Sequence, residues 1–298
     1  MSIIESALQK LRRTSAAAGT RDDATAGPVG AIAGAATAFG AAAPAAGYAL
    51  KRMTLDTADL CAAGYLPEHD DEHRLADYYR RIKRPLIEKA LAPDATPDMR
   101  LIIVSSALPG EGKTFTSINL ALSMAQERDV SVLLVDADVP KKRISEMCGV
   151  RREPGLVDAV MDESLDVESL ILRTDVRGLD ILAAGRSVDN ATELLASTRM
   201  AQIAVRLGAR NPRRLIVLDA PPLLVSSEAR ALVMLPAQVV LVVRSGVTTR
   251  RAILDAIAQV DTRKLRGLIL NDTALGRGDR YYRYSDYAPG GGETSGGA

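Results

Sequence analysis

Short apolar runs alternate with longer amphipathic stretches between residues 100 and 272. The apolar runs are continuous, which indicates strands that are buried on both faces of a sheet. They lie at residues 101–106, 130–135, 179–183, 215–218, 239–243 and 267–270. The stretches between them, such as 114–127 and 191–208, predict helices that cross from one parallel strand to the next. The pattern therefore predicts an α/β fold with a doubly wound, mostly parallel sheet.

The N-terminal part of the chain has a different pattern. Residues 1–13 contain apolar positions three and four apart, which is the spacing of a short amphipathic helix. Residues 14–68 are expected to be a linker that is rich in alanine and glycine as far as residue 50. The apolar part of this segment is long enough for a membrane span, but Pro28 and Pro44 interrupt it and its small side chains bury little area. We expect a linker rather than a span.

One folded domain is expected to occupy residues 69–272. It opens with a charged helix, predicted at residues 72–91, and ends with the last apolar run. Residues 273–298 are expected to be a flexible tail, because their glycine-rich end cannot pack a core.

Composition narrows the function classes. The 298 residues include 38 basic and 37 acidic side chains, so the net charge of +1 does not favour a general nucleic-acid binder. The two cysteines, Cys61 and Cys148, form no CxxC pair and support neither a disulfide framework nor a cysteine-rich metal site. This usage is typical of a reducing cytoplasm.

A phosphate-binding loop follows the first apolar run of the domain. The segment Ala107–Thr114 reads ALPGEGKT, which fits the phosphate-loop spacing with alanine in place of the first glycine. Its small residues let backbone amides face phosphates, while Lys113 reaches the β and γ oxygens and the Thr114 hydroxyl can bind Mg²⁺. The residues expected to contact the nucleotide here are Gly110, Glu111, Gly112, Lys113, Thr114 and Phe115.

Two further apolar runs end in carboxylates. Asp136 and Asp138 follow the second run, and Asp219 follows the fourth, before Ala-Pro-Pro. Because parallel strands share one carboxyl edge, these side chains are expected to meet the phosphate loop. Each could separately be a turn-forming aspartate, but all three in this register favour magnesium and γ-phosphate chemistry.

Tyrosine is concentrated near the C-terminus. Four of the eight tyrosines are Tyr281, Tyr282, Tyr284 and Tyr287. A tail that carries tyrosine without function is the alternative, but aromatic residues rarely enrich such segments, so a substrate tail is preferred. Asn271 precedes Tyr281 by ten residues, which span at most about 35 Å when extended. The tail can reach its own active site or that of a neighbour.

Together these motifs resemble a known family. The AxxPGEGKT loop, the Asp136-Ala137-Asp138 segment and the Asp219-Ala220-Pro221-Pro222 segment look like the Walker A, A′ and B motifs of the bacterial tyrosine kinases of exopolysaccharide systems, which are related to MinD/ParA ATPases. The segment 190–197, NATELLAS, is similar to the family's NPxELLxS segment. The resemblance covers roughly residues 70–287 and is greatest to the exosortase-A-associated tyrosine autokinases.

The resemblance implies an ATP- and Mg²⁺-dependent tyrosine autokinase. It implies that Lys113 and Thr114 bind phosphates and Mg²⁺, that Asp219 and Asp136 hold the metal, and that Asp136 or Asp138 accepts the tyrosine proton. Asn271 resembles the base-contacting asparagine of the related ATPases; a strand-ending turn is an equal alternative. The tail tyrosines would be phosphorylated between subunits of a ring-like homo-oligomer.

The same resemblance implies partners and a location. The expected partners are a membrane polysaccharide co-polymerase that activates the chain and a tyrosine phosphatase, with no nucleic acid. The expected location is cytoplasmic, associated with the inner membrane through a partner. The family's oligomerisation motif is ExxRxxR, and Asp77, Arg80 and Lys83 hold its positions here, at a spacing expected to place them on one helix face. A solvated charged face is the alternative.

Two departures leave alternatives open. Pro140 stands where the family often has an arginine, so Lys141, Lys142 or Arg143 substitutes for it or the chain is a weak or idle kinase. A positioning or partition ATPase of the MinD/ParA type is the other function. That group has a signature lysine where Leu108 stands here, and the tyrosine tail also favours the kinase.

Overall fold

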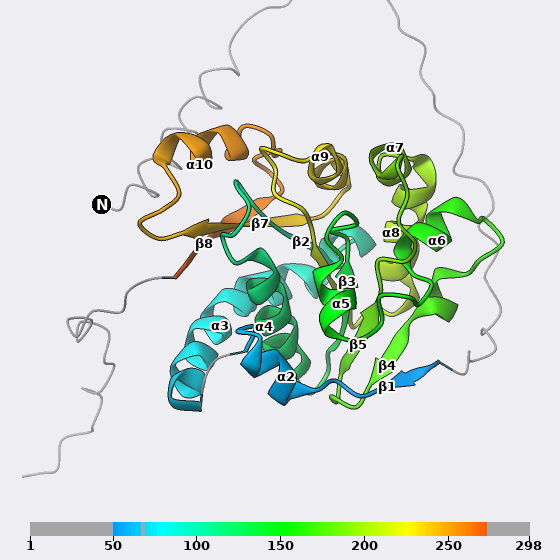
Figure 1. The fold of residues 1–298 in the computed structure, drawn as a ribbon, viewed down its shortest axis with the longest axis horizontal. Helices are drawn as coiled ribbons and strands as arrows, with labels where there is room; N and C mark the ends of the chain where they lie inside the picture. The colour runs from blue at the N-terminus through cyan, green and yellow to red at the C-terminus, as the bar shows by residue number, and fades with distance from the viewer. Residues whose placement is uncertain (1–49, 67–68, 273–298) are drawn as a thin grey trace, which may run out of the picture.

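One sheet organises the chain. The computed structural model describes residues 50–66 and 69–272, except for the side chains of residues 69–73. Its strands are β1 (Arg52–Met53), β2 (Leu101–Ser106), β3 (Ser131–Asp136), β4 (Leu172–Thr174), β5 (Leu179–Leu182), β6 (Arg214–Asp219), β7 (Gln238–Arg244) and β8 (Leu265–Asn271). Within these residues they form one sheet in the order β1-β4-β5-β3-β6-β2-β7-β8 (Figure 1).

The mostly parallel α/β fold expected from the sequence is confirmed. The pairs from β5 through to β8 are all parallel, and β4 pairs with β5 in the antiparallel direction. Each of the six apolar runs forms a strand. The strands β1 and β4 were not expected, because two or three residues are too few to show a strand pattern in a sequence.

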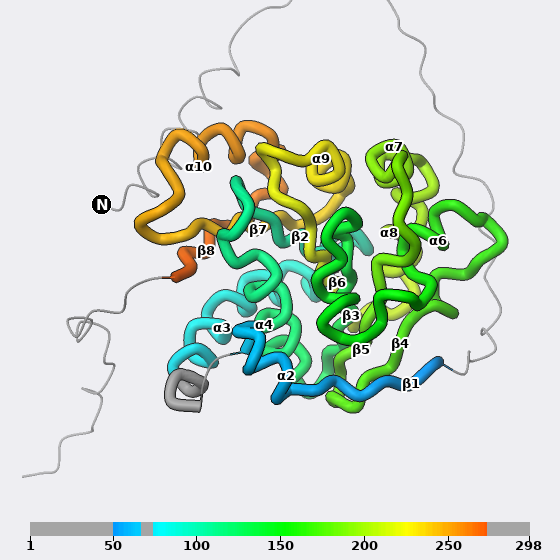
Figure 2. The backbone as a smooth tube through the Cα atoms, in the orientation of Figure 1, coloured from blue at the N-terminus to red at the C-terminus, as the bar shows by residue number. Residues whose placement is uncertain are grey.

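Helices cover both faces of the sheet (Figure 1, Figure 2). One core contains side chains from α2 (Thr57–Ala62), α3 (His69–Ala90), α4 (Lys113–Ala125) and α5 (Arg143–Met147). The other core contains side chains from α6 (Leu156–Met161), α7 (Ala191–Leu195), α8 (Thr198–Arg210), α9 (Ser227–Met234) and α10 (Arg250–Ile257). Two 3₁₀ helices, η1 (Pro97–Arg100) and η2 (Val167–Leu170), complete the elements.

The helix expected over 191–208 is two helices. The helix α7 ends at Leu195, and Ser197 has an extended backbone at the N-cap of α8. The Ser197 hydroxyl accepts a hydrogen bond from the Met200 amide at 3.1 Å, which stabilises the new helix start. The periodicity continues across the break, so the pattern alone did not reveal it.

The folded domain begins before the end of the expected linker. Residues 50–66 fall within the interval 14–68, yet β1 pairs with β4, and Leu55 and Leu60 are buried in the core that also contains α3 and α4 side chains. The Asp56 carboxylate accepts hydrogen bonds from the amides of Ala58 and Asp59 and so caps α2. These residues are part of the domain rather than of a linker.

Several expectations lie outside the described residues. They are the amphipathic helix of residues 1–13, the alanine-rich part of the linker, and the tail of residues 273–298 with its four tyrosines. Among the described residues, no helix is both long enough and apolar enough to cross a bilayer.

Candidate active site

Three neighbouring strands bring the candidate residues to one edge of the sheet. In the sheet β6 lies between β2 and β3, and Asp219 of β6 is in register with Asp136 of β3. The phosphate loop leaves the carboxyl end of β2, on the other side of β6. The order of the strands reverses around β2. On one side of β2 lie β6 and then β3, and on the other side lies β7. Such a crevice is where doubly wound sheets bind ligands.

The phosphate loop has the backbone that its glycines permit. Gly112 has φ +90° and caps the start of α4, and a Cβ there would lie 1.9 Å from the Asn271 side-chain nitrogen. That nitrogen donates a hydrogen bond to the Glu111 carbonyl at 3.0 Å. The close approach of Asn271 at the end of β8 therefore requires glycine at position 112.

Glu111 anchors the loop from within. Its side chain is buried, one carboxylate oxygen accepts a hydrogen bond from the Leu108 amide at 2.9 Å, and the other accepts one from the Thr248 hydroxyl. These contacts fix the turn that aims the amides before α4. Glu111 was expected to contact the nucleotide, and in this structure its carboxylate contacts the protein.

Lys113 and Asp138 form a buried ion pair. The Lys113 ammonium lies 2.6 Å from an Asp138 oxygen, and the two side chains are 9% and 1% exposed. Burial by itself would lower the pKa of Lys113, but the carboxylates of Asp219 and Asp138 raise it above its ordinary value. Lys113 is therefore charged at neutral pH.

Asp219 faces the first turn of α4. The Thr114 hydroxyl donates a hydrogen bond to one of its oxygens at 2.7 Å, and the Ser117 hydroxyl lies 3.0 Å from the other. Burial raises the pKa of Asp219, while Lys113 and the Thr114 hydroxyl oppose that rise. Thr114 and Asp219 thus present two oxygen ligands in one place. Ser117 was not among the expected site residues, although it lies one turn after Lys113.

Only one carboxylate oxygen of Asp136 is hydrogen-bonded within the described residues. The Ser145 amide and hydroxyl both lie 2.7 Å from one of its oxygens, and the hydroxyl accepts a hydrogen bond from the Ala184 amide. The other oxygen is buried and has no partner within the described residues. Burial raises the pKa of Asp136 to about 7, although the Ser145 contacts lower it. The sequence gives no signal for Ser145, which reaches the site through tertiary packing.

The structure therefore brings most of the expected residues together. The loop residues, the three aspartates and Asn271 meet at the carboxyl edge, linked by the contacts above. Phe115 lies in the first turn of α4, where its carbonyl accepts a hydrogen bond from the Asn119 side chain at 2.8 Å. Whether Phe115 and Asn271 contact a nucleotide stays a prediction.

The expected interface residues do not share one exposed face. Asp77 and Arg80 form an exposed ion pair at 2.9 Å. Lys83 is buried, and its ammonium donates to the Ser123 carbonyl at 2.5 Å and lies 2.8 Å from Glu127. Six residues of helix rotate by about 600°, which leaves Asp77 and Lys83 about 120° apart around α3. The expectation of a common face is wrong for Lys83.

The site contains oxygen atoms that could bind a metal ion, but its described side chains do not form a complete ligand set. Among the described side chains, no group of three or more His, Cys, Asp or Glu could hold a metal ion. The oxygens of Thr114, Asp219 and Asp136 fit Mg²⁺, which prefers oxygen and commonly takes one or two carboxylates together with phosphates and water. The unpartnered Asp136 oxygen is consistent with such a ligand set.

Comparison with known proteins finds a matching family and several related kinases. The AAA domain family matches residues 99–265. YwqD, a tyrosine-protein kinase of Bacillus subtilis, is 31% identical over 188 residues, which are 62% of this chain and 78% of YwqD. EpsB of Ralstonia nicotianae is 33% identical over 196 residues, which are 63% of this chain and 26% of EpsB. The chain thus spans most of YwqD and about a quarter of EpsB.

Solved kinase domains share the fold. The kinase domain of the Escherichia coli tyrosine kinase ETK superposes with a TM-score of 0.58 at 26% identity, over 66% of this chain and 74% of the ETK chain. The VpsO kinase domain superposes with a TM-score of 0.57 at 29% identity, over 68% of this chain and 98% of the VpsO chain. Since the AAA domain match spans residues 99–265 and the chain covers 78% of YwqD at 31% identity, the chain belongs to the AAA domain family and to the bacterial tyrosine kinases.

Proposed function

We propose that this chain is an ATP-dependent protein-tyrosine autokinase that phosphorylates its own C-terminal tyrosines. The observation that carries the proposal is the 2.6 Å contact between Lys113 of the phosphate loop and Asp138 of the second acidic segment. Lysine is the residue of this loop that reaches the β and γ phosphates. A carboxylate beside this lysine would lie close to the phosphoryl group of a bound nucleotide.

The residues divide the chemistry between them. Lys113 and the loop amides bind and orient the phosphates, and Lys113 stabilises the negative charge of a loose transition state. Thr114, Asp219 and Asp136 would hold Mg²⁺, which neutralises phosphate charge. When Lys113 turns to the phosphates, Asp138 loses its partner and can accept the phenol proton. An acceptor is needed because a tyrosine hydroxyl ionises only near pH 10.

The position of the C-terminal end of β8 supports the proposal that the tail is the substrate. Asn271, the last residue of β8, contacts the phosphate loop, so the chain leaves the sheet beside the site. The proposed substrates are Tyr281, Tyr282, Tyr284 and Tyr287. A ten-residue connection reaches at most about 35 Å, which allows transfer within one chain or between two. We propose transfer between subunits of a homo-oligomer, with the exposed Asp77 and Arg80 at the contact.

The biological setting rests on the family resemblance. The proposed role is regulation of exopolysaccharide synthesis or export, with a membrane polysaccharide co-polymerase as activator and a tyrosine phosphatase as antagonist. The proposed location is the cytoplasm, at the inner membrane through that partner.

Labelled ATP with magnesium tests the chemistry. We expect label on tyrosine in the intact chain, none in Lys113→Met, and ATP binding with little label in a chain that ends after Thr273. ATP hydrolysis without phosphotyrosine on any form would refute the kinase and favour the MinD/ParA-type ATPase.

A mixing experiment tests transfer between chains. Intact Lys113→Met supplies tyrosines without activity, and the truncated chain supplies activity without tyrosines. Label on the Lys113→Met chain in the mixture is expected. If intact protein labels itself at a rate independent of concentration and the mixture stays unlabelled, transfer occurs within one chain.

A further inference from the structure

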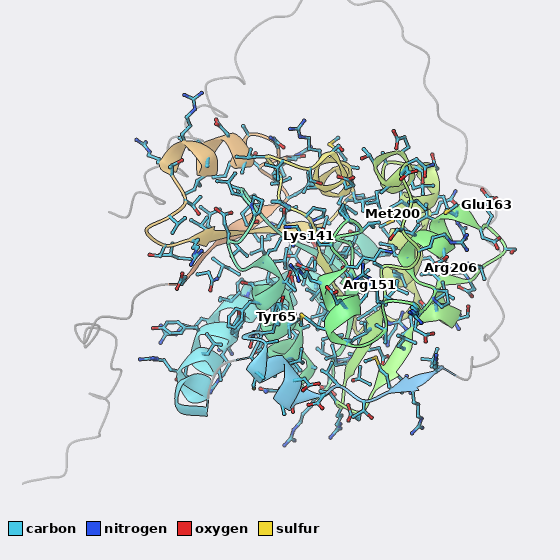
Figure 3. All side chains as sticks on the ribbon, viewed as in Figure 1. Tyr65, Lys141, Arg151, Glu163, Met200 and Arg206 are labelled. Atoms are coloured by element: carbon cyan, nitrogen blue, oxygen red, sulfur yellow. The ribbon has the colours of Figure 1, made fainter. Side chains whose placement is uncertain are left out.

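A cationic pocket opens beside the candidate active site. The cavity, of about 720 Å³, lies between the α5 region and the loops before α6 and after β5. We call it the cationic pocket; its charged lining residues are Lys142, Arg151, Arg152, Glu153, Asp158 and Arg186. Four cations against two carboxylates leave an excess of positive charge. In Figure 3, Arg151 lies beside α5.

Lys142 connects the pocket to the backbone of the segment that carries Asp138. It is buried, unlike its neighbours Lys141 and Arg143, which are exposed. Its backbone has φ +49°, a left-handed conformation that is uncommon for a residue with a side chain. The Lys142 amide donates to the Asp138 carbonyl at 2.7 Å, and its ammonium donates to the Gly185 carbonyl at 2.5 Å. The fold thus turns Lys142, among the three cations after Pro140, inward.

The acidic residues of the pocket are already engaged. Asp158 accepts hydrogen bonds from the Gly155 amide at 2.9 Å and the Arg186 side chain at 2.5 Å. Glu153 pairs with Lys51 outside the cavity lining.

The remaining cations are left without enough opposite charge. Arg151 has one exposed partner, Glu146, at 2.9 Å. Arg152 is exposed and has no ion pair among the described side chains. Burial and the nearby charge of Arg151 lower the pKa of Lys142. An anion in the pocket would relieve this repulsion.

We propose that the cationic pocket binds the phosphate of a phosphotyrosine side chain. A phosphomonoester carries close to two negative charges and three acceptor oxygens, and clustered arginines are the usual way in which proteins recognise it. A cavity of about 720 Å³ also has room for the ring and its flanking residues. The pocket adjoins the segment of Asp138, since the amide of its lining residue Lys142 donates to the Asp138 carbonyl.

The tail is the proposed source of this phosphotyrosine, so this part of the inference rests on the proposed function. Residues 273–298 contain three arginines and three carboxylates, and the unmodified tail has no excess of negative side-chain charge. Phosphorylation changes that balance. A tyrosine that has been modified can then be held in the pocket while another lies at the catalytic centre.

Peptide binding tests the pocket separately from catalysis. The probe is a fluorescent peptide of residues 278–289 with phosphate on Tyr284, added to full-length protein that has been treated with a phosphatase. Saturating ADP and magnesium occupy the phosphate loop, and no ATP is present. We expect the phosphopeptide to bind at least about tenfold more tightly than the unmodified peptide, the factor that one charge-assisted hydrogen bond contributes.

Two exposed pairs of arginines provide the variant and its control. We expect Arg151→Gln with Arg152→Gln to lower the phosphopeptide affinity at least about tenfold. Arg230→Gln with Arg251→Gln removes the same charge from α9 and α10 and is expected to leave the affinity unchanged. Both pairs are exposed, so neither substitution should disturb the core.

Four results would each overturn the proposal: equal binding of the two peptides, equal loss in both double variants, much tighter phosphopeptide binding when ADP and magnesium are left out, or equal binding of a peptide with phosphoserine at position 284. Since the assay involves no phosphoryl transfer, failure of the kinase reaction would not by itself produce any of them.

Discussion

Removing the Lys113 charge should destabilise the fold as well as stop catalysis. In Lys113→Met an apolar side chain of similar length replaces the ammonium, and Asp138 and Asp219 remain buried without their cation. Breaking a buried pair in this way costs about 3–5 kcal/mol, because one charge is left uncompensated. For a domain of this size that lowers the melting temperature by about 6–20 °C.

A double-mutant cycle separates the ion pair from packing. The assay is thermal and urea unfolding of the wild-type chain, Lys113→Met, Asp138→Asn and the double variant, all without nucleotide. We expect the double variant to be more stable than the sum of the single effects by at least about 1 kcal/mol, since neither charge is then unpaired. Lys141→Met, at an exposed neighbouring position, is the control and should change stability by less than about 0.5 kcal/mol.

Either of two results would contradict a buried pair of Lys113 and Asp138. If Lys113→Met costs under 1 kcal/mol, or if the two single effects add within about 0.5 kcal/mol, the pair is not a buried interaction in solution. The 2.6 Å contact would then not describe the nucleotide-free protein.

Three further predictions concern the loop, the buried aspartate and α3. Gly112→Ala should weaken nucleotide binding, measured by calorimetry, because φ +90° costs about 1–2 kcal/mol and the new Cβ would displace Asn271. The pKa of Asp136 is raised to about 7 in the folded state, so between about pH 4 and 7 the folded state binds more protons than the unfolded state. In metal-free protein the contribution of Asp136 to stability is therefore present below about pH 4 and is lost as the pH rises to 7. Asp136→Asn should flatten this fall in pH-dependent urea unfolding. Lys83→Met should lower stability by about 1–3 kcal/mol in urea unfolding without altering the oligomeric state, measured by light scattering.

Each of these has its own control. Gly110 also has a positive φ, but a Cβ there would lie in open space, so Gly110→Ala is the control. Equal losses of nucleotide affinity in both alanine variants would mean that the contact with Asn271 does not contribute. An unchanged pH profile in Asp136→Asn would mean that Asp136 is ionised throughout. Asp77→Ala with Arg80→Ala is the comparison for Lys83, and loss of an oligomer in Lys83→Met alone would contradict the buried position of Lys83.

Much of the site could be predicted because most of its residues directly follow buried strands. The loop before Thr114 and the carboxylates Asp136 and Asp219 each follow a continuous apolar run, and in a parallel sheet such positions meet at one edge. Local pattern and a general rule of topology therefore suffice for them. The direction in which Lys142 points among three adjacent cations has no such rule, since the left-handed turn at Lys142 decides it.

The sequence by itself determined the fold class, the phosphate loop and the set of carboxylates, because apolar period and motif spacing are properties of neighbouring residues. Only the tertiary structure decided which side chains meet: Ser145 contacts Asp136, Asn271 lies against Gly112, and Lys83 is buried against Glu127. The physical reason is that helix rotation and sheet packing set these contacts. A contact made across the sheet or between two helices leaves no periodic trace in the residues that make it.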